Sequence, residues 1–264
     1  MTTHANDKQL LVEQSGAIAT ITFNRPEKLN AFTIDVWRDL GTAFLNLSEN
    51  DDIRCVVMRG AGEKAFSPGN DISEFETTRS NKQQAIAYGE VMRRTIEAIA
   101  NCPHPVVAQI HGICVGGGME IASLADIRIC GASSRFGVPI KNLGLVMSYT
   151  ELTPLVKLVG PSVALNVLLQ GTIFDAQEAL RLGVVNRVVP DDEVASEVAA
   201  TVARVAAGAP LVARWHKKFI RRLGTGAELT DAERAEAFEC FDTEDFRTGY
   251  QAFLKKETPA FTGR

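Results

Sequence analysis

The sequence has no long apolar run, no excess of positive charge and no spaced cysteine pattern, and each absence excludes a class of protein. Nowhere do about 18 apolar residues follow one another, which is the length that a membrane-spanning helix needs. The N-terminal segment is polar and lacks the charged-then-apolar pattern of a secretory signal. We therefore expect a cytoplasmic protein that does not associate with membranes.

The charge balance argues against nucleic acid as a partner. Lysine and arginine together number 28 and aspartate and glutamate 32, which gives a formal net charge of -4. Binding to nucleic acid would favour a strongly basic surface, so a polyanionic ligand must meet a local basic patch instead. The basic cluster at residues 214–222 is typical of one solvated helix face.

Histidine and cysteine are too few and too scattered to suggest a metal centre. The 4 histidines lie far apart, and no two of the 5 cysteines have the C-x-x-C spacing. The cysteines lie mostly inside apolar runs. We expect reduced thiols in the core and no bound metal.

The hydrophobic pattern that is present predicts an α/β fold. Residues 10–23 predict two short strands joined by a turn. Thr33 is typical of a helix N-cap, and its helix should reach Leu47. Residues 55–58 are short, apolar and β-branched enough for a buried strand.

The same theme recurs further along the chain. A helix containing Ile96 precedes a predicted strand at residues 106–110, and a helix opened by glycines 116–118 precedes another strand at 126–130. We interpret this as a repeated ββα pattern, with stacked sheets and helices outside. Beyond residue 190 the spacing is helical only, and aromatic residues are frequent near the end. Such a tail should pack on its own core or on a neighbouring subunit.

Residues 65–72 contain the sequence Pro-Gly-Asn-Asp between apolar positions, and these four residue types favour turns. Taken alone, this composition is typical of a surface turn. Its functional interpretation is that Gly69 permits a tight bend, which turns the amide N–H of Asn70 into a cavity.

Glycines 116–118 stand where an apolar strand meets a helix. Each costs roughly 0.5–1 kcal/mol relative to alanine in regular structure, so something must favour all three, and close approach of a ligand is the usual reason. The pattern is neither G-x-G-x-x-G nor a P-loop. What remains is a helix N-terminus whose free N–H groups suit a developing negative charge.

Several segments, in this order and spacing, resemble the crotonase superfamily, which is the enoyl-CoA hydratase/isomerase family. They are Asn24-Arg25-Pro26, Asn30-Ala31 and residues 65–72, 116–120, 125–128, 183–186 and 252–256. The resemblance covers nearly the whole chain. It implies an α/β, crotonase-like spiral of ββα repeats at residues 1–195, with the CoA-ester site. Residues 196–264 would form a helical C-terminal oligomerisation region that makes a homotrimer or hexamer.

The resemblance also implies an acyl-CoA-processing enzyme, with enoyl-CoA hydratase as the best single interpretation. The amides of Asn70 and Gly117 would form an oxyanion hole for the thioester enolate, where one lost donor costs about 2.7–4 kcal/mol of transition-state stabilisation. Glu120, flanked by Met119 and Ile121, should lie in an apolar pocket with a raised pKa suited to proton transfer. The alternative is a first-turn glutamate that the helix dipole favours.

Coenzyme A would be part of the substrate, with no separate cofactor. The residues that the resemblance places around CoA are Lys28, Leu29, Ala31, Pro68, Asn70, Asp71, Ile72 and Lys256. Lys256 would reach the CoA phosphates, often from a neighbouring subunit. A lysine supplies the compact cation that phosphate needs.

The chain departs from the family pattern at Ile140, where hydratases carry a second catalytic glutamate. Isoleucine cannot transfer a proton. The nearby polar residues are poor substitutes: Lys141 should point elsewhere, Ser148 and Tyr149 lie a turn or loop later, and Glu151 is expected to face solvent.

Three interpretations follow from this departure. Glu120 could act as a single acid in hydration, it could serve isomerisation or carbon–carbon cleavage alone, or the chain could be a non-catalytic acyl-CoA-binding protein. Ile140 and Gly116 should line the acyl pocket, and its more apolar character would suit a bulky acyl group.

Overall fold

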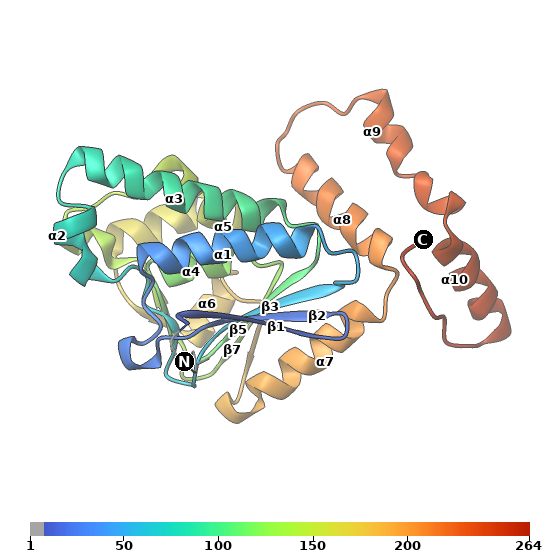
Figure 1. Ribbon diagram of the computed structural model, residues 1–264, viewed down its shortest axis with the longest axis horizontal. Coiled ribbons are helices and arrows are strands. Elements are labelled where there is room, and N and C mark those ends of the chain that lie inside the picture. Colours follow the sequence, from blue (N-terminus) through green and yellow to red (C-terminus); the bar gives the residue numbers. More distant parts are fainter. Residues whose placement is uncertain (1–7) are drawn as a thin grey trace, which may run out of the picture.

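The computed structural model describes residues 8–264, in which strands and helices alternate as far as β10 (Figure 1). The strands are β1 (Leu10–Ser15), β2 (Ile18–Phe23), β3 (Cys55–Gly60), β4 (Ala65–Ser67), β5 (Val106–Ile110), β6 (Ile113–Val115), β7 (Ile127–Gly131), β8 (Arg135–Gly137), β9 (Phe174–Asp175) and β10 (Arg187–Val189). The α-helices are α1 (Ile34–Ser48), α2 (Phe75–Thr78), α3 (Lys82–Asn101), α4 (Gly117–Ser123), α5 (Tyr149–Gln170), α6 (Ala176–Arg181), α7 (Val194–Ala206), α8 (Pro210–Leu223), α9 (Asp231–Glu236) and α10 (Glu244–Lys255).

Two sheets carry the ββα spiral that the sequence predicts. The large sheet has the order β1-β2-β3-β5-β7-β10, and the small sheet has the order β4-β6-β8-β9. Each turn of the chain places one strand in the large sheet and the next in the small one, as β3 and β4, β5 and β6, and β7 and β8 do. The expected fold class is therefore confirmed.

Helices cover both faces of the large sheet. Figure 1 shows α1 and α3 on one side and α7 on the other. Thr33 caps α1 as expected, because its hydroxyl accepts a hydrogen bond from the amide of Val36. Valines 194, 198 and 202 of α7 pack on Val57 and Val107 of the sheet, so α7 is part of the packed body.

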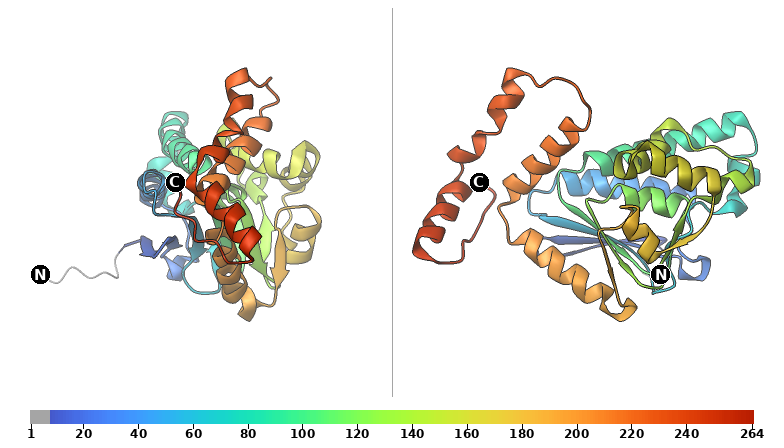
Figure 2. Two further views of the ribbon diagram at one scale, coloured as in Figure 1. Left: turned by 90° about the vertical axis from the view of Figure 1, so that its right-hand side faces the viewer. Right: turned by 180° about the vertical axis from the view of Figure 1, so that it is seen from behind.

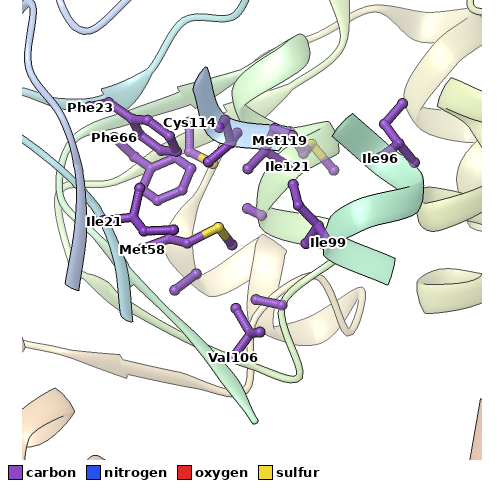
Figure 3. Packing of buried hydrophobic residues seen from close by; sticks show 14 of the residues in the cluster. Ile21, Phe23, Met58, Phe66, Ile96, Ile99, Val106, Cys114, Met119 and Ile121 are labelled. Carbon is purple, nitrogen blue, oxygen red and sulfur yellow. The ribbon is translucent and has the colours of Figure 1, made fainter. Parts of the chain in front are cut away.

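The main core anchors the strand that leads into the candidate site. Phe23 of β2 meets Phe66 of β4 edge-on, with ring centroids 5.2 Å apart, and both side chains are buried (Figure 3). Met58 and Ile21 pack beside them. Since truncating a buried phenylalanine to alanine costs about 3–5 kcal/mol, this packing holds β4 firmly in place.

The C-terminal helices α8 to α10 form an arm that stands away from the body (Figures 1 and 2). Lys217 of α8 attaches the arm, because its Nζ lies 2.6 Å from the carboxylate of Asp126 and the residue is only 9% exposed. The prediction of a solvated basic face is therefore wrong for Lys217. The arm carries exposed aromatic residues, namely Phe238, Phe241, Phe246, Tyr250 and Phe253.

One helix of the described residues, α5, is long and apolar enough to cross a membrane by length and composition. Its backbone is broken at Gly160, where φ is 75°. Its first turn is packed into the protein, because Glu151 and Leu155 are buried.

Candidate active site

The candidate site lies where three strands of the small sheet end. β4, β6 and β8 run parallel to one another, so their carboxyl ends meet at one edge. Asn70, Gly117 and Ile140 follow these three strand ends. The topology therefore brings together residues that are distant in the sequence.

The backbone after β4 lies against the start of α4. A Cβ atom on Gly69, where φ is 98°, would lie 2.6 Å from the amide nitrogen of Gly117. A Cβ atom on Gly118 would lie 2.1 Å from the carbonyl oxygen of Ser67. These glycines are thus required by contact between two segments of the chain itself, which accounts for Gly118 without a ligand.

Two amide groups remain unpaired at this contact. On either side of Asn70, the carbonyl of Gly69 and the amide of Asp71 both bond to Phe32 at 2.8 Å. The amide of Gly116 donates to Gly137. The amides of Asn70 and Gly117, by contrast, donate to no residue within 8–264, and a Cβ on Gly117 would lie 3.6 Å from the Asn70 nitrogen. Two such neighbouring donors can hold one developing oxyanion.

The side chain of Asn70 joins the loop after β4 to helices α1 and α3. Its Oδ1 accepts a hydrogen bond of 2.6 Å from the indole Nε1 of Trp37, which is buried in α1. The hydroxyl of Tyr88 in α3 lies 3.5 Å from the same oxygen. Sequence reasoning missed Trp37 and Tyr88, since an apolar helix position gives no sign of a polar partner.

A cavity of about 290 Å³ opens beside the two amides. It is lined by Pro68, Asn70, Ile72, Phe75, Arg79, Val115, Gly116, Gly117, Glu120, Val138, Pro139, Ile140, Asn142, Leu143, Leu145, Met147 and Glu151. Of the described residues, only Arg79, Glu120 and Glu151 in this lining are ionisable. A larger hollow of about 650 Å³ lies between α3, α5 and α8, but neither amide nor Glu120 lines it.

Glu120 is almost completely buried on α4, with 3% of the residue exposed. Its Oε1 has no hydrogen-bond partner in the part of the chain that the structure describes. Burial raises the pKa of the Glu120 carboxyl well above its usual range, the nearby Glu151 adds to this pKa rise, and Arg79 opposes it. The carboxyl is therefore suited to proton transfer, and a solvated first-turn role does not fit it.

Arg79 supplies the only cation of the described lining, and no sequence motif marks it as a site residue. Its guanidinium lies over the rings of Tyr88 and Phe75, with centroid distances of 4.7 and 5.0 Å. Such stacking holds a cation without a carboxylate partner. The charge of Arg79 is therefore available to the cavity.

Ile140 and Gly116, which are predicted to line the acyl pocket, both line this cavity. Among the poor substitutes for the missing glutamate, Lys141 donates to the carbonyl of Leu169 at 2.9 Å, and Tyr149 is 92% exposed. Glu151 differs from its expected position. It is only 8% exposed and lines the same cavity as Glu120, so the expectation that it faces solvent is wrong.

The predicted CoA-binding residues fall into two groups. Pro68, Asn70 and Ile72 line the cavity. The loop that carries Lys28, Leu29 and Ala31 lies next to the cavity loop, because Arg25 donates both to the Ala31 carbonyl and to Asp71.

Asp71 uses its side chain within the protein. One oxygen accepts from Arg25 at 3.0 Å, and the other accepts from the amide and hydroxyl of Ser73. These bonds, that of the Ser73 hydroxyl above all, hold the pKa of the Asp71 carboxyl below its ordinary value. The Asp71 carboxylate thus joins the two loops.

Lys256 follows α10 as its C-cap, and α10 belongs to the arm (Figure 2). In Figure 1, α10 and α2 stand at opposite ends of the molecule. Lys256 does not line the cavity of its own chain.

Comparison with known proteins gives a consistent result. A family model described as enoyl-CoA hydratase/isomerase matches residues 13–264. A short-chain-enoyl-CoA hydratase of Clostridium acetobutylicum is 32% identical over 249 residues, which is 94% of this chain and 95% of that protein. A crotonyl-CoA hydratase of Syntrophomonas wolfei is 30% identical and covers 97% of this chain and 99% of its own length.

Solved structures agree with these relatives. An enoyl-CoA hydratase/carnithine racemase from Magnetospirillum magneticum superposes with a TM-score of 0.96 at 47% identity, covering 97% of this chain and 96% of that one. An enoyl-CoA hydratase from Bacillus anthracis superposes with a TM-score of 0.90 at 28% identity, covering 97% and 100%. The similarity therefore extends over the core and the arm together.

Proposed function

Since the chain belongs to the enoyl-CoA hydratase/isomerase family, we propose that it adds water to the double bond of an enoyl-CoA thioester bound in the cavity beside Asn70 and Gly117. The chain is an acyl-CoA enzyme of the hydratase type, and the proposal concerns its reaction and its residues. The observation that carries it is the pair of unpaired amides at the cavity wall.

The amides of Asn70 and Gly117 would bind the thioester oxygen. Addition at the β-carbon places negative charge on that oxygen, and fixed backbone donors stabilise this charge without reorganising. The start of α4 contributes its positive dipole end at the same point. Side-chain changes at position 70 are tolerable in this arrangement, because the donor belongs to the main chain.

Glu120 would deliver the proton to the α-carbon of the substrate. Burial raises the pKa of the Glu120 carboxyl well above its ordinary value, which favours the protonated form that a general acid needs. The proton taken up by the α-carbon then needs no other donor. General acid catalysis of this kind contributes typically about 10²–10⁴-fold to a rate.

The CoA moiety would lie along the neighbouring loops and extend toward a second subunit. Lys28, Leu29 and Ala31 lie on the loop joined to the cavity loop, and Pro68 and Ile72 line the cavity itself. The exposed aromatic residues of the arm favour self-association as a homotrimer or hexamer, which would bring the partner's arm to the site. Coenzyme A is then part of the substrate, and the reaction needs no other cofactor.

Isomerisation or carbon–carbon cleavage by Glu120 alone is the second candidate, and Ile140 favours it because that side chain cannot activate water. A panel of CoA esters, followed by mass spectrometry, separates the candidates. Gain of one water indicates hydration, a changed spectrum at constant mass indicates isomerisation, and two smaller products indicate cleavage. Binding of every ester without any product would overturn the enzymatic proposal and leave an acyl-CoA-binding protein.

The residue assignment is tested by Glu120→Gln, which keeps the size of the side chain and removes its proton transfer. We expect a loss of about 10²–10⁴-fold in kcat with CoA-ester binding retained. Unimpaired turnover would remove Glu120 from the mechanism.

A further inference from the structure

We propose that Glu151 is the second acid–base group of the site and activates the water that adds to the enoyl-CoA. The inference rests on the proposed hydration and names the group that this reaction still lacks. It is carried by the position of Glu151, which lines the cavity from α5 while Glu120 lines it from α4. Two carboxyl groups thus face one cavity even though position 140 is apolar.

The backbone holds Glu151 in a defined orientation. Its Oε2 accepts a hydrogen bond of 2.7 Å from the amide of Ser148, and its own amide donates to the Ser148 hydroxyl at 3.4 Å. This is a capping box at the start of α5. Its Oε1 has no hydrogen-bond partner among residues 8–264, so one oxygen is anchored and the other is available to a ligand in the cavity.

The burial of Glu151 is not explained by capping alone. A capping glutamate works as well at the surface, and Glu233 in the capping box of α9 is partly exposed. Glu151 is instead 92% buried, since only 8% of the residue is exposed, and it shares its cavity with the unpartnered Oε1 of Glu120. Burying a carboxylate costs free energy, and the hydrogen bond from the Ser148 amide engages only one oxygen of Glu151, so capping does not account for the burial of the other oxygen.

No other described residue of the lining can accept the proton of water. Arg79 is a cation and the amides of Asn70 and Asn142 have no basic group. Apart from the two glutamates, the remaining residues of the lining are apolar or glycine. Both carboxyl groups are buried, but Oε2 of Glu151 accepts a hydrogen bond from the Ser148 amide, whereas Oε1 of Glu120 has no partner among the described residues. Burial, together with the nearby Glu151, raises the pKa of the Glu120 carboxyl. The pair is therefore divided into an acid on α4 and a base on α5.

The reaction step balances with these two groups. The oxygen of water forms a bond to the β-carbon while one proton of that water passes to the Glu151 carboxylate. The electron pair of the double bond moves toward the thioester carbonyl, and the α-carbon then takes the proton of Glu120. The product is a 3-hydroxyacyl-CoA, and exchange with solvent returns a proton to Glu120 and removes one from Glu151.

The test uses Glu151→Gln in the full-length protein, because glutamine also completes a capping box and the helix start is preserved. Two rates are measured for each variant: hydration of crotonyl-CoA, and exchange of the α-hydrogens of butyryl-CoA in deuterium oxide. Exchange requires only the oxyanion hole and Glu120. We expect Glu151→Gln to lower the kcat of hydration about 10²–10⁴-fold with little change in KM, and to change exchange by less than about tenfold.

Glu178→Gln is the matched control, because Glu178 occupies the same third position of α6 and its amide bonds to the cap Asp175, outside the cavity. Hydration by Glu151→Gln within about threefold of the native rate would overturn the inference, and an equal loss of both rates would assign Glu151 to the enolate step instead. If native protein hydrates no ester in the panel, the proposed function fails, which is a separate result. If the glutamine variant does not fold, Glu151→Asp replaces it, and loss of its hydration with retained exchange is the expected outcome.

Discussion

The indole nitrogen of Trp37 donates a hydrogen bond of 2.6 Å to the side-chain oxygen of Asn70, a residue that lines the cavity and whose backbone N–H donates to no described residue. The bond joins α1 to the loop after β4. It is a short bond between a buried donor and a loop that carries one of the two oxyanion donors. The position of that donor therefore depends on a residue that lies outside the cavity.

Removing this bond with Trp37→Phe should displace the Asn70 amide. A neutral hydrogen bond contributes about 0.5–1.5 kcal/mol. Loss of one such bond corresponds to a decrease in kcat of up to about tenfold, and we expect a smaller change in KM. Trp215→Phe is the control, since Trp215 lies on α8 and does not line the cavity. Equal kinetics for both variants would show that the Trp37 bond has no effect on the oxyanion hole.

Gly69→Ala should remove activity more severely than it removes stability. The new Cβ would lie 2.6 Å from the Gly117 amide nitrogen, so the two donors must move apart. Since loss of one donor costs about 2.7–4 kcal/mol, we expect kcat to fall by 10²–10³-fold.

Gly62→Ala separates this clash from backbone strain. Gly62 also has a positive φ, 72°, but a Cβ there meets nothing within 4 Å. Both variants should lose roughly 1–2 kcal/mol of folding free energy from the left-handed backbone, as thermal unfolding can measure. Only Gly69→Ala should lose activity, and loss in both would attribute the effect to strain alone.

The pH dependence of stability should report the buried carboxyl of Glu120. Folding raises its pKa, so the stabilisation that the protonated form contributes is complete below the unfolded pKa, near 4.5, and is lost as the pH rises through the folded value. Glutamine has no such transition. Glu120→Gln should therefore melt at a higher temperature than the native protein at about pH 8, and the difference should shrink toward acidic pH.

Glu151 and Arg79 are the charged groups that line the cavity with Glu120 and shift its pKa. Changing Arg79 therefore gives a second test of the raised pKa of Glu120. Arg79→Gln removes the charge that opposes the rise, so the pH at which hydration declines should move upward. A native protein whose melting temperature matches that of Glu120→Gln at every pH would contradict the raised pKa.

Phe253→Asp should weaken self-association. Phe253 is 83% exposed in the single chain, and it lies in the arm with the other exposed aromatic residues. Exposed apolar side chains of this size, gathered on one arm, are typical of an interaction surface, and we expect a second copy of the chain to bury them. Light scattering should show a smaller assembly for Phe253→Asp and an unchanged assembly for Val12→Asp, which alters an exposed residue of β1 instead.

The large sheet and its helices could be predicted from the sequence because their elements are long enough to show a pattern. The strand predicted at 106–110 is β5, and the helix predicted from Thr33 is α1. The small sheet could not be predicted in this way, since β4, β6 and β8 have 3 residues each and alternation needs more. Its strand ends nevertheless position the whole candidate site.

From the residues alone, without the family resemblance, the site could be predicted only where the backbone conformation requires glycine. Gly69 and Gly118 are such positions, because two chain segments lie too close together there for a side chain. No sequence feature identifies Glu151 as a site residue. Its sequence context is that of a helix cap, and only the three-dimensional arrangement of α4 and α5 brings it to the same cavity as Glu120.

Moving a carboxyl group from position 151 to position 140 tests whether the cavity needs a second acid–base group or this particular residue. Ile140 lines the cavity and follows the end of β8, so Ile140→Glu would direct a carboxyl into the same space from another wall. Introduced alone, it would place three carboxyl groups in one apolar cavity, and mutual repulsion would raise their pKa values. Introduced together with Glu151→Gln, it keeps their number at two.

We expect this double variant to recover at least about tenfold of the hydration rate that Glu151→Gln alone loses, because a second base again reaches the water. The control is Ile140→Gln with Glu151→Gln, which has a polar side chain of the same size and no basic group. Recovery by glutamate and not by glutamine would show that the reaction depends on a carboxylate beside Glu120, supplied in the native chain by α5. If both double variants recover the rate equally, hydration depends on the polarity of the cavity, and Glu151 acts by binding water and not by accepting its proton.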